Sequence, residues 1–259
     1  MNPGPMISLA GVHFSYDGPD QPVLRDLSLA IPRAAVTAIL GPNGSGKTTL
    51  LSLILGMLSP QEGTIRIDGR IQADYSRRAM SRLMGLVPQE ESYPFGFSVL
   101  EYVLLGRAPY LGLLERPGPV DVQAAWKALE TAGLAALSQR PIPSLSGGER
   151  QLATVARALA QEPSVLLLDE PTAHLDLSNR RCVLDVIRAL SDGGVTAVLT
   201  THDPNAAAAV ADHVVLMRQG QLVAAGPVEM VFNAANLSAT YGLPVEVVRV
   251  HGRPIVLAL

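Results

Sequence analysis

The sequence has little of several residue types on which common classes of protein depend. Its 259 residues include a single cysteine, Cys182, so an internal disulfide framework and a cysteine-based metal cluster are excluded, and a reducing compartment is favoured. Charged residues make up 17%, below the roughly 25% of typical soluble domains, whereas hydrophobic residues reach 48%. Such a chain buries a large core and is not disordered as a whole. Its low charge also indicates that a partner covers part of its apolar surface.

Long apolar runs and a surplus of positive charge are missing as well. No uncharged apolar stretch approaches the roughly 18 residues that a membrane-spanning helix needs, and residues 1–20 lack the basic and apolar segments of a signal peptide. We therefore expect a chain that is soluble by itself. With 20 basic and 23 acidic residues the formal net charge is −3, which gives no overall electrostatic signature of a nucleic-acid partner, and we expect none.

The hydrophobic pattern predicts the order of secondary structure along the chain. Two alternating segments, residues 7–16 and 23–31, predict strands separated by a turn. An apolar run, residues 36–40, then leads through a glycine-rich loop into a helical segment, residues 47–58. Over residues 93–160 apolar residues recur at helical spacing, and beyond that stretch strands and helices alternate again.

This order predicts a single domain of the α/β class. Its catalytic core is expected to contain a mostly parallel sheet from residues 1–92 and 161–235, with an antiparallel β flank at the N-terminal end. Residues 93–160 are expected to form an inserted α-helical subdomain. Residues 236–259 are expected to form a C-terminal β-hairpin tail that turns at Gly252.

Residues 41–48 carry the first motif with a defined chemistry. They read GPNGSGKT and match G-x-x-x-x-G-K-[ST] at every fixed position, between a predicted strand and a predicted helix, which is the context of a phosphate-binding P-loop. The glycines let successive backbone N–H groups face an anion, and the helix N-terminus adds a positive dipole. Lys47 is expected to reach the β- and γ-phosphates of a nucleotide, and the Thr48 hydroxyl to ligate Mg²⁺. The ATP-binding residues predicted here are Gly41, Pro42, Asn43, Gly44, Ser45, Gly46, Lys47, Thr48 and Thr49.

Two acidic residues end a buried-strand run at residues 165–170. Acids at such a position often only cap a following helix. At a strand end beside a phosphate loop, however, Asp169 is where a carboxylate that organises Mg²⁺ belongs. Glu170 is then placed to polarise water for in-line attack on the γ-phosphate, as a general base. Together with the loop, the two acids predict a P-loop NTPase core.

Residues 145–151, LSGGERQ, indicate the class of P-loop protein. SGG before a helix offers a second N-terminal anion site, and a helix cap alone would need neither the second glycine nor the following Glu-Arg-Gln. The sequence here resembles the ATP-binding-cassette (ABC) family, whose signature is LSGGQ with LSGGE as a common variant. In that family the opposite subunit donates this loop. The resemblance therefore implies that Ser146, Gly147 and Gly148 contact ATP bound to a second copy of the chain.

The resemblance covers about residues 6–235, with six motifs in the family's order, and it assigns further roles. It implies that Gln89 joins the core to the helical lobe and touches Mg²⁺ or its water. It implies that His202, which follows a predicted strand at the same sheet edge as the two acids, is a catalytic residue that contacts the γ-phosphate. It also implies that Asp176 lies in a loop that communicates between two ATP sites, and that Tyr16 stacks on adenine.

A few residues lie outside these motifs. The turn at residues 32–35, PRAA, departs from the Gly-Glu pair that is usual in the family, but it lies away from the chemistry. Cys182, in a predicted helix, is expected to be a small buried residue. Trp126 and the methionines are expected to pack within the helical lobe.

A further stretch indicates the branch of the family. Residues 103–112, VLLGRAPYLG, resemble a GR-x-P-h-x-G segment of cassettes that serve importers of iron-siderophore, haem and cobalamin, although they are also readable as an Arg-Ala-Pro turn that closes a helix. The resemblance implies an ATP-hydrolysing subunit that dimerises around two ATP molecules and drives uptake through a multi-spanning permease. A substrate-binding protein would act indirectly, and this chain would lie on the cytoplasmic face of the inner membrane.

Other members of the same superfamily stay open as alternatives. The subunit could serve an exporter with separate subunits, or an importer of molybdate or another metal species. A ribosome-associated protein normally joins two cassettes in one chain, and this chain has one. A chromosome-maintenance or DNA-repair ATPase carries long coiled coils between the phosphate loop and the signature, whereas Lys47 and Ser146 are only 99 residues apart and no sustained heptads intervene.

Overall fold

The computed structural model describes residues 4–16, 18, 21–91, 93, 96–250 and 252–259. Its central sheet has the order β10–β9–β3–β8–β7–β6, parallel except for β10. Strands β3, β7 and β8 are buried along their whole length, as expected of central parallel strands. The strands of this sheet are β3 (Val36–Leu40), β6 (Met84–Val87), β7 (Val165–Asp169), β8 (Thr196–Thr201), β9 (His213–Arg218) and β10 (Gln221–Pro227).

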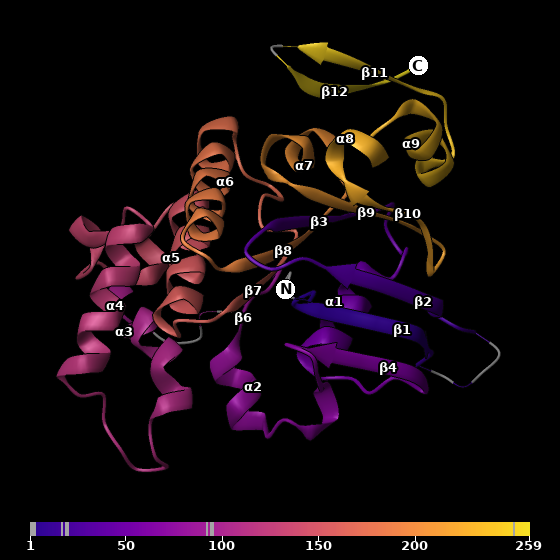
Figure 1. The fold of residues 1–259 in the computed structure, drawn as a ribbon. Helices are drawn as coiled ribbons and strands as arrows, with labels where there is room; N and C mark the ends of the chain where they lie inside the picture. Colours follow the sequence, from indigo (N-terminus) through magenta and orange to yellow (C-terminus); the bar gives the residue numbers. More distant parts are fainter. Residues whose placement is uncertain (1–3, 17, 19–20, 92, 94–95, 251) are drawn as a thin grey trace.

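A second, antiparallel sheet of order β2–β1–β4–β5 lies beside the central one (Figure 1). Buried and exposed side chains alternate along β2, so one face of this sheet is in the core and the other is not. The helix α1 (Lys47–Leu55) follows β3 and packs with these strands. The strands are β1 (Ile7–Phe14), β2 (Leu24–Ile31), β4 (Glu62–Ile67) and β5 (Arg70–Ile71).

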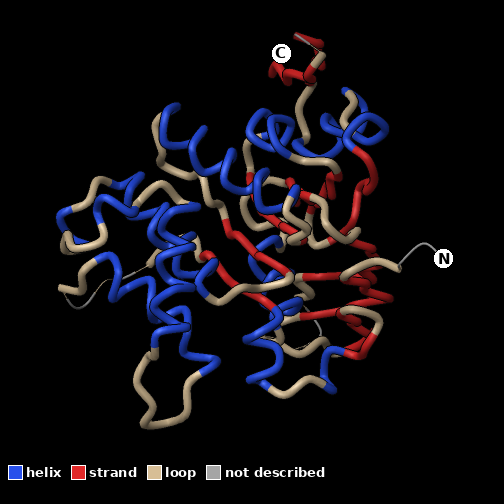
Figure 2. The backbone as a smooth tube through the Cα atoms, turned by 60° about the vertical axis from the view of Figure 1, so that its left-hand side comes forward, coloured by secondary structure: helices blue, strands red, loops and turns tan. Residues whose placement is uncertain are grey.

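Three helices between β6 and β7 pack on one another at one side of the molecule (Figures 1 and 2). They are α3 (Val99–Leu104), α4 (Pro119–Thr131) and α5 (Gly147–Ala160), joined by the 3₁₀ turns η2 (Leu105–Tyr110), η3 (Ala135–Leu137) and η4 (Ile142–Ser144). The turn η1 (Gln72–Asp74) and helix α2 (Arg77–Leu83) precede β6. This helical group is inserted between two neighbouring strands of the central sheet.

The C-terminal part of the chain covers the β9–β10 end of the central sheet (Figure 1). Two helices flank β8, and two shorter ones follow β10: α6 (Leu177–Asp192), α7 (Pro204–Val210), α8 (Val228–Val231) and α9 (Ala234–Tyr241). A hairpin of β11 (Val245–Val250) and β12 (Arg253–Ala258) ends the chain and packs on α7 and α9.

Alternate side chains of the central strands enter two separate cores. Along β7, Leu166 and Leu168 pack with helices α3 to α6, whereas Val165 and Leu167 pack with α1 and the antiparallel sheet. The carboxyl end of β7, with Asp169, therefore lies between these two packed layers. Across the described part of the chain, every helix is too short or too polar to cross a lipid bilayer.

The α/β fold class, with a mostly parallel sheet, an antiparallel flank and inserted helices, is confirmed. The terminal hairpin turns at Gly252, because Val250 pairs with Arg253, but its first strand begins only at Val245. Helices α2, α8 and α9 were not predicted.

Two predictions about packing were wrong. Cys182 is exposed, since the buried residues of α6 are Val183, Leu184, Ile187 and Ser191, and these define a face from which Cys182 points away. Trp126 does pack with the helical group, but the buried methionines lie instead in the core between the two sheets. These are Met6, Met80, Met84 and Met217.

Candidate functional site

The loop of residues 41–46, between β3 and α1, adopts backbone conformations that its glycines permit. Gly44 and Gly46 have φ angles of 77° and 97°, a region that other residues rarely adopt. A Cβ on Gly46 would also lie 2.7 Å from Leu24 Cδ2, so this glycine lets the loop lie close against β2. The loop turns back on itself and leads directly into the first turn of α1, whose N-terminal N–H groups are suited to bind an anion.

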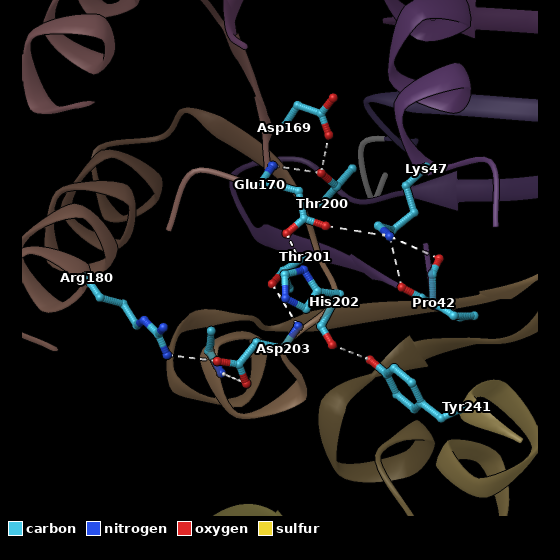
Figure 3. A network of polar contacts seen from close by, with 12 residues as sticks. Pro42, Lys47, Asp169, Glu170, Arg180, Thr200, Thr201, His202, Asp203 and Tyr241 are labelled. Atoms are coloured by element: carbon cyan, nitrogen blue, oxygen red, sulfur yellow. Dashed lines mark hydrogen bonds and ion pairs between the residues drawn. The ribbon is translucent and has the colours of Figure 1, made fainter. Parts of the chain in front are cut away.

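Lys47, the first residue of α1, connects this loop to the end of β7. Its side chain is only 8% exposed, and its Nζ donates hydrogen bonds to the carbonyl oxygens of Gly41 (2.9 Å) and Pro42 (3.3 Å). The same Nζ lies 3.6 Å from Glu170 Oε1 (Figure 3). The predicted phosphate-binding lysine and the predicted general base are therefore neighbours.

The two acids after β7 are oriented by a threonine of the adjacent strand β8. The Thr200 hydroxyl donates to Asp169 Oδ1 (2.5 Å) and accepts from the Glu170 N–H (2.9 Å) (Figure 3). Both acids are buried, and Glu170 has a φ of 49°, a strained conformation for a residue other than glycine. We did not predict Thr200 from the sequence, although its position two residues before His202 in a buried strand was a usable signal.

His202 follows β8 and faces Glu170. Its Nδ1 lies 2.8 Å from Glu170 Oε2, while its side chain is 58% exposed. Its backbone is held on both sides, because the Thr201 hydroxyl accepts from the Asp203 N–H (3.0 Å) and the Tyr241 hydroxyl donates to the His202 carbonyl (3.0 Å). Glu170 thus has a lysine at one carboxylate oxygen and an imidazole at the other.

Three further predicted residues border this centre. Tyr16 is 60% exposed, and its hydroxyl lies 3.2 Å from Thr49 Oγ1 in the first turn of α1. Thr48 is exposed on the same turn. Gln89 is exposed two residues beyond the end of β6, next to the carboxyl end of β7, and its side chain makes no hydrogen bond to any residue that the structure describes.

The LSGGE residues lie at the start of α5, and the structure corrects our argument about them. Ser146 is the N-cap: its hydroxyl accepts from the Glu149 N–H (3.3 Å), and Glu149 Oε2 accepts from the Ser146 N–H (2.7 Å). These bonds form a capping box and keep the pKa of Glu149 below its ordinary value. The helix cap therefore uses this glutamate, contrary to our prediction.

The second glycine of the motif, Gly148, is required by packing within the single chain. A Cβ on Gly148 would lie 2.1 Å from the side-chain Cγ of Asn179, whereas a Cβ on Gly147 would meet nothing within 4 Å. Asn179 belongs to the first turn of α6 and donates its N–H (2.7 Å) and Nδ2 (3.0 Å) to the carboxylate of Asp176, the N-cap of that helix. Gly148 therefore lets the start of α5 lie against the start of α6.

The structure brings some predicted residues together and leaves others apart. Lys47, Asp169, Glu170 and His202 meet around the carboxyl ends of β7 and β8, with Tyr16 and the phosphate loop beside them. Among the residues that the structure describes, no hydrogen bond or ion pair joins the LSGGE motif to this centre. Nor does any cluster of three His, Cys, Asp or Glu side chains with metal-ligand geometry occur in the described ranges.

The GRAPYLG segment forms one wall of a groove. Arg107, only 3% exposed, donates to Asp121 (3.0 Å), Glu162 (2.9 Å) and the Ala160 carbonyl (2.8 Å), and lies 3.9 Å from the ring centroid of Tyr110. These contacts fix η2 against α4 and α5. The groove has a volume of about 1020 Å³ and runs between η2 and the region around α2; its lining includes Leu58, Met80, Leu105, Pro109 and Arg157.

Comparisons with known proteins agree with this arrangement. Residues 24–173 match the family model described as ABC transporter. The chain is 36% identical to a probable iron chelatin transport ATP-binding protein of Helicobacter pylori, over 98% of this chain and all of that protein. It is 39% identical to the hemin import ATP-binding protein HmuV of Streptomyces coelicolor, over 95% of this chain and 86% of that protein. Among solved structures, a metal-chelate type ABC transporter in an inward-facing conformation matches with a TM-score of 0.86 and 34% identity, over all of this chain and 98% of that chain.

Proposed function

This chain belongs to the ABC transporter family and is an ATPase of that family, and on that premise we propose that it is the ATP-hydrolysing subunit of an importer. The proposed cargo is a metal chelate such as an iron-siderophore complex, haem or cobalamin. The names of the H. pylori and S. coelicolor relatives and of the matching solved transporter support this cargo class.

The observation that carries the proposal is the row of contacts from Lys47 through Glu170 to His202 beside the phosphate loop. Lys47 and the N–H groups of the loop bind the β- and γ-phosphates of ATP. Glu170 takes the proton of the water that attacks the γ-phosphate, and Thr200 keeps its backbone in place. His202 contacts the γ-phosphate, and Tyr16 stacks on adenine.

Mg²⁺ is the metal that the residues present would fit. Thr48, Asp169 and Gln89 offer oxygen atoms, the ligand type that Mg²⁺ prefers, and Mg²⁺ takes few protein ligands when a nucleotide supplies phosphates. The Thr200 hydroxyl donates a hydrogen bond to Asp169 Oδ1. Asp169 Oδ2 accepts no hydrogen bond from any residue that the structure describes. When bound, the ion neutralises negative charge on the β- and γ-phosphates.

A second copy of the chain is proposed to complete each site. Among the described residues of one chain, no hydrogen bond joins Ser146, Gly147 or Gly148 to the residues around Lys47. In the proposal they contact ATP bound to the other copy, with two ATP molecules between the two chains. ATP then supplies contacts that exist only in the closed dimer, and its binding shifts the equilibrium toward closure. Hydrolysis removes the γ-phosphate contacts and allows reopening, while Asp176 communicates between the two sites.

A multi-spanning permease is the proposed membrane partner. The groove beside η2 is partly apolar, and Arg107 fixes one of its walls, which suits it to receive a helix of the permease. The chain would then lie peripherally on the cytoplasmic face of the inner membrane, and a substrate-binding protein would contact the permease only. We also propose the division into a core (1–92 and 161–235), a helical subdomain (93–160) and a tail (236–259).

The test is purification of tagged Glu170→Gln protein from detergent-solubilised membranes with ATP, followed by mass spectrometry and light scattering. We expect an ATP-dependent dimer that retains a multi-spanning permease, because the variant binds ATP without hydrolysing it. Lys47→Ala should lose nucleotide affinity, and the exposed Glu130→Gln on α4 should behave as wild type. Recovery of ribosomal proteins or nucleic acid in place of a permease would contradict the importer proposal, and a monomer with ATP would contradict the dimer.

A further inference from the structure

The last part of the chain contacts His202, which ends the row formed by Lys47, Glu170 and His202. This part contains α9 and the β11–β12 hairpin; in Figure 1 the hairpin lies above α7, and α9 lies beyond α8. Helix α7 begins at Pro204, directly after His202 and its neighbour Asp203. Within the described residues, hydrogen bonds of two side chains, Tyr241 and Asn205, connect these segments at or just before the start of α7.

The first contact is a hydrogen bond from Tyr241 to the backbone of His202. The Tyr241 hydroxyl donates to the His202 carbonyl at 3.0 Å (Figure 3). Burial, together with the nearby negative charges of Asp203 and Glu170, raises the pKa of Tyr241 well above its ordinary value. A tyrosine hydroxyl is protonated at physiological pH even at its ordinary pKa, so the Tyr241 hydroxyl is a donor there.

Tyr241 is held in place independently of His202. It is the last residue of α9, which ends at Gly242 with a φ of 75°. The Arg218 guanidinium donates to the Ala239 carbonyl (2.6 Å), and the Ser238 hydroxyl accepts from the Val245 N–H (3.1 Å). The end of α9 is thus fastened to β9 on one side and to the start of the hairpin on the other.

The second contact fastens α7 to the hairpin. Asn205, in the first turn of α7, accepts from the Val256 N–H (2.8 Å) and donates to the Val256 carbonyl (3.3 Å). Its amide pairs with the β12 backbone as a neighbouring strand would. Val247 and Val256 pack against the larger core beneath. The hairpin therefore holds the helix that follows His202.

We propose that Tyr241 is a positioning residue for His202. The imidazole is 58% exposed, and Glu170 is the one partner that the structure gives its ring nitrogens, so little besides its backbone fixes where it points. The hydrogen bond from Tyr241 acts on that backbone together with the bond between Thr201 and Asp203, and it thereby helps to set the distance between His202 and Glu170. This inference rests on the proposed catalytic role of His202 and assigns to the C-terminal segment a part in hydrolysis.

The test compares two variants that each lose one tyrosine hydroxyl. Tyr241→Phe removes the bond to His202. Tyr75→Phe removes a bond of the same kind, from Tyr75 to the Ile67 carbonyl (2.9 Å), at the groove beside η2 and not at the Lys47–Glu170–His202 row. We expect Tyr241→Phe to lower kcat for ATP about fivefold, the factor that one ordinary hydrogen bond represents, with KM within twofold. Both variants are assayed on the chain without permease, so the groove that Tyr75 lines is not engaged, and Tyr75→Phe should keep the wild-type kcat.

A spectroscopic readout separates positioning from general destabilisation. In protein labelled at histidine, the ring signals of His202, assigned with His202→Gln, should shift or broaden in Tyr241→Phe and stay unchanged in Tyr75→Phe. A wild-type kcat in Tyr241→Phe, equal losses in both variants, or an unchanged His202 signal would each overturn the inference. Absence of ATPase activity in the wild-type chain would instead contradict the proposed function, so the two failures are distinguishable.

Discussion

Replacing Gly148 by alanine tests whether the second glycine of LSGGE is required by the fold of a single chain. The new Cβ would lie 2.1, 2.3 and 2.5 Å from the side-chain Cγ, Oδ1 and Nδ2 of Asn179. Asn179 cannot simply swing away, because its side chain and its N–H are both bonded to Asp176. The start of α5 or of α6 must therefore shift, or the bonds to Asp176 must break.

The expected loss of stability can be worked out from these contacts. Overpacking of this kind costs about 1–3 kcal/mol, and the higher helix propensity of alanine offsets up to about 1 kcal/mol. We expect Gly148→Ala to lower the free energy of unfolding by about 1–2 kcal/mol. For a chain of this size that corresponds to a decrease in Tm of about 2–8 °C.

The assay is urea and thermal unfolding without nucleotide, with two matched variants. Gly147→Ala, one residue earlier, places its Cβ in open space and should be as stable as wild type or slightly more stable. Asn179→Ala should restore most of the loss in the Gly148→Ala background, since it removes the atoms that clash. Equal stability of Gly147→Ala and Gly148→Ala would refute the packing argument. An undiminished loss in the Asn179→Ala background would show that Asn179 is not the obstacle.

Further predictions concern the groove wall and the cysteine. Arg107→Ala leaves Asp121 buried without its cation and should lower the free energy of unfolding by about 3 kcal/mol in urea titrations. The control Arg181→Ala loses only an exposed ion pair on α6 and should be clearly less destabilising. Similar losses in the two variants would contradict the role of Arg107. A hydrogen bond from the Gly118 N–H and the Arg107 guanidinium lower the pKa of Asp121. Its contribution to stability is therefore complete at neutral pH and is lost as the pH falls below about 4, so Asp121→Asn should lose less stability than wild type on acidification. Exposed Cys182 should react with a thiol reagent in the folded protein, one group per chain, and Cys182→Ser should change stability by less than about 0.5 kcal/mol; reaction only in denaturant would contradict its exposure.

The centre of the fold could be predicted because its signals are local. Three segments can each be predicted from a few adjacent residues. They are the apolar run before the phosphate loop, the loop itself, and the buried run that ends in Asp169 and Glu170. Parallel strands then bring their carboxyl ends to one sheet edge, which places His202 near the same two acids. No long-range contact has to be known in advance for this part of the site.

Contacts between distant segments could not be predicted in the same way. Tyr241 is 39 residues from His202 and Asn179 is 31 from Gly148, and neither pair belongs to a motif with a fixed spacing. Helix α9 is eight residues long and carries little apolar pattern of its own, so it became visible only through its packing on β9. Cys182 was misjudged because the general tendency of cysteine to be buried was weighed above the helical spacing of the residues that follow it.

The LSGGE loop is already ordered in the single chain, although the proposal assigns its contact with ATP to a dimer of two chains. Folding of one chain already accounts for Ser146 and Glu149 as a capping box and for Gly148 as a packing position, which leaves Gly147 as the glycine with open space before it. The cap holds the N-terminal turn of α5 fixed, so its N–H groups and the Ser146 hydroxyl are oriented before any partner arrives. Ordering a loop on association costs conformational entropy. In this chain the loop is already ordered when the single chain has folded, so association does not have to order it. Closure of a second copy over ATP would therefore need little rearrangement of the donating loop, and the energy of the γ-phosphate contacts would act on the approach of the two chains.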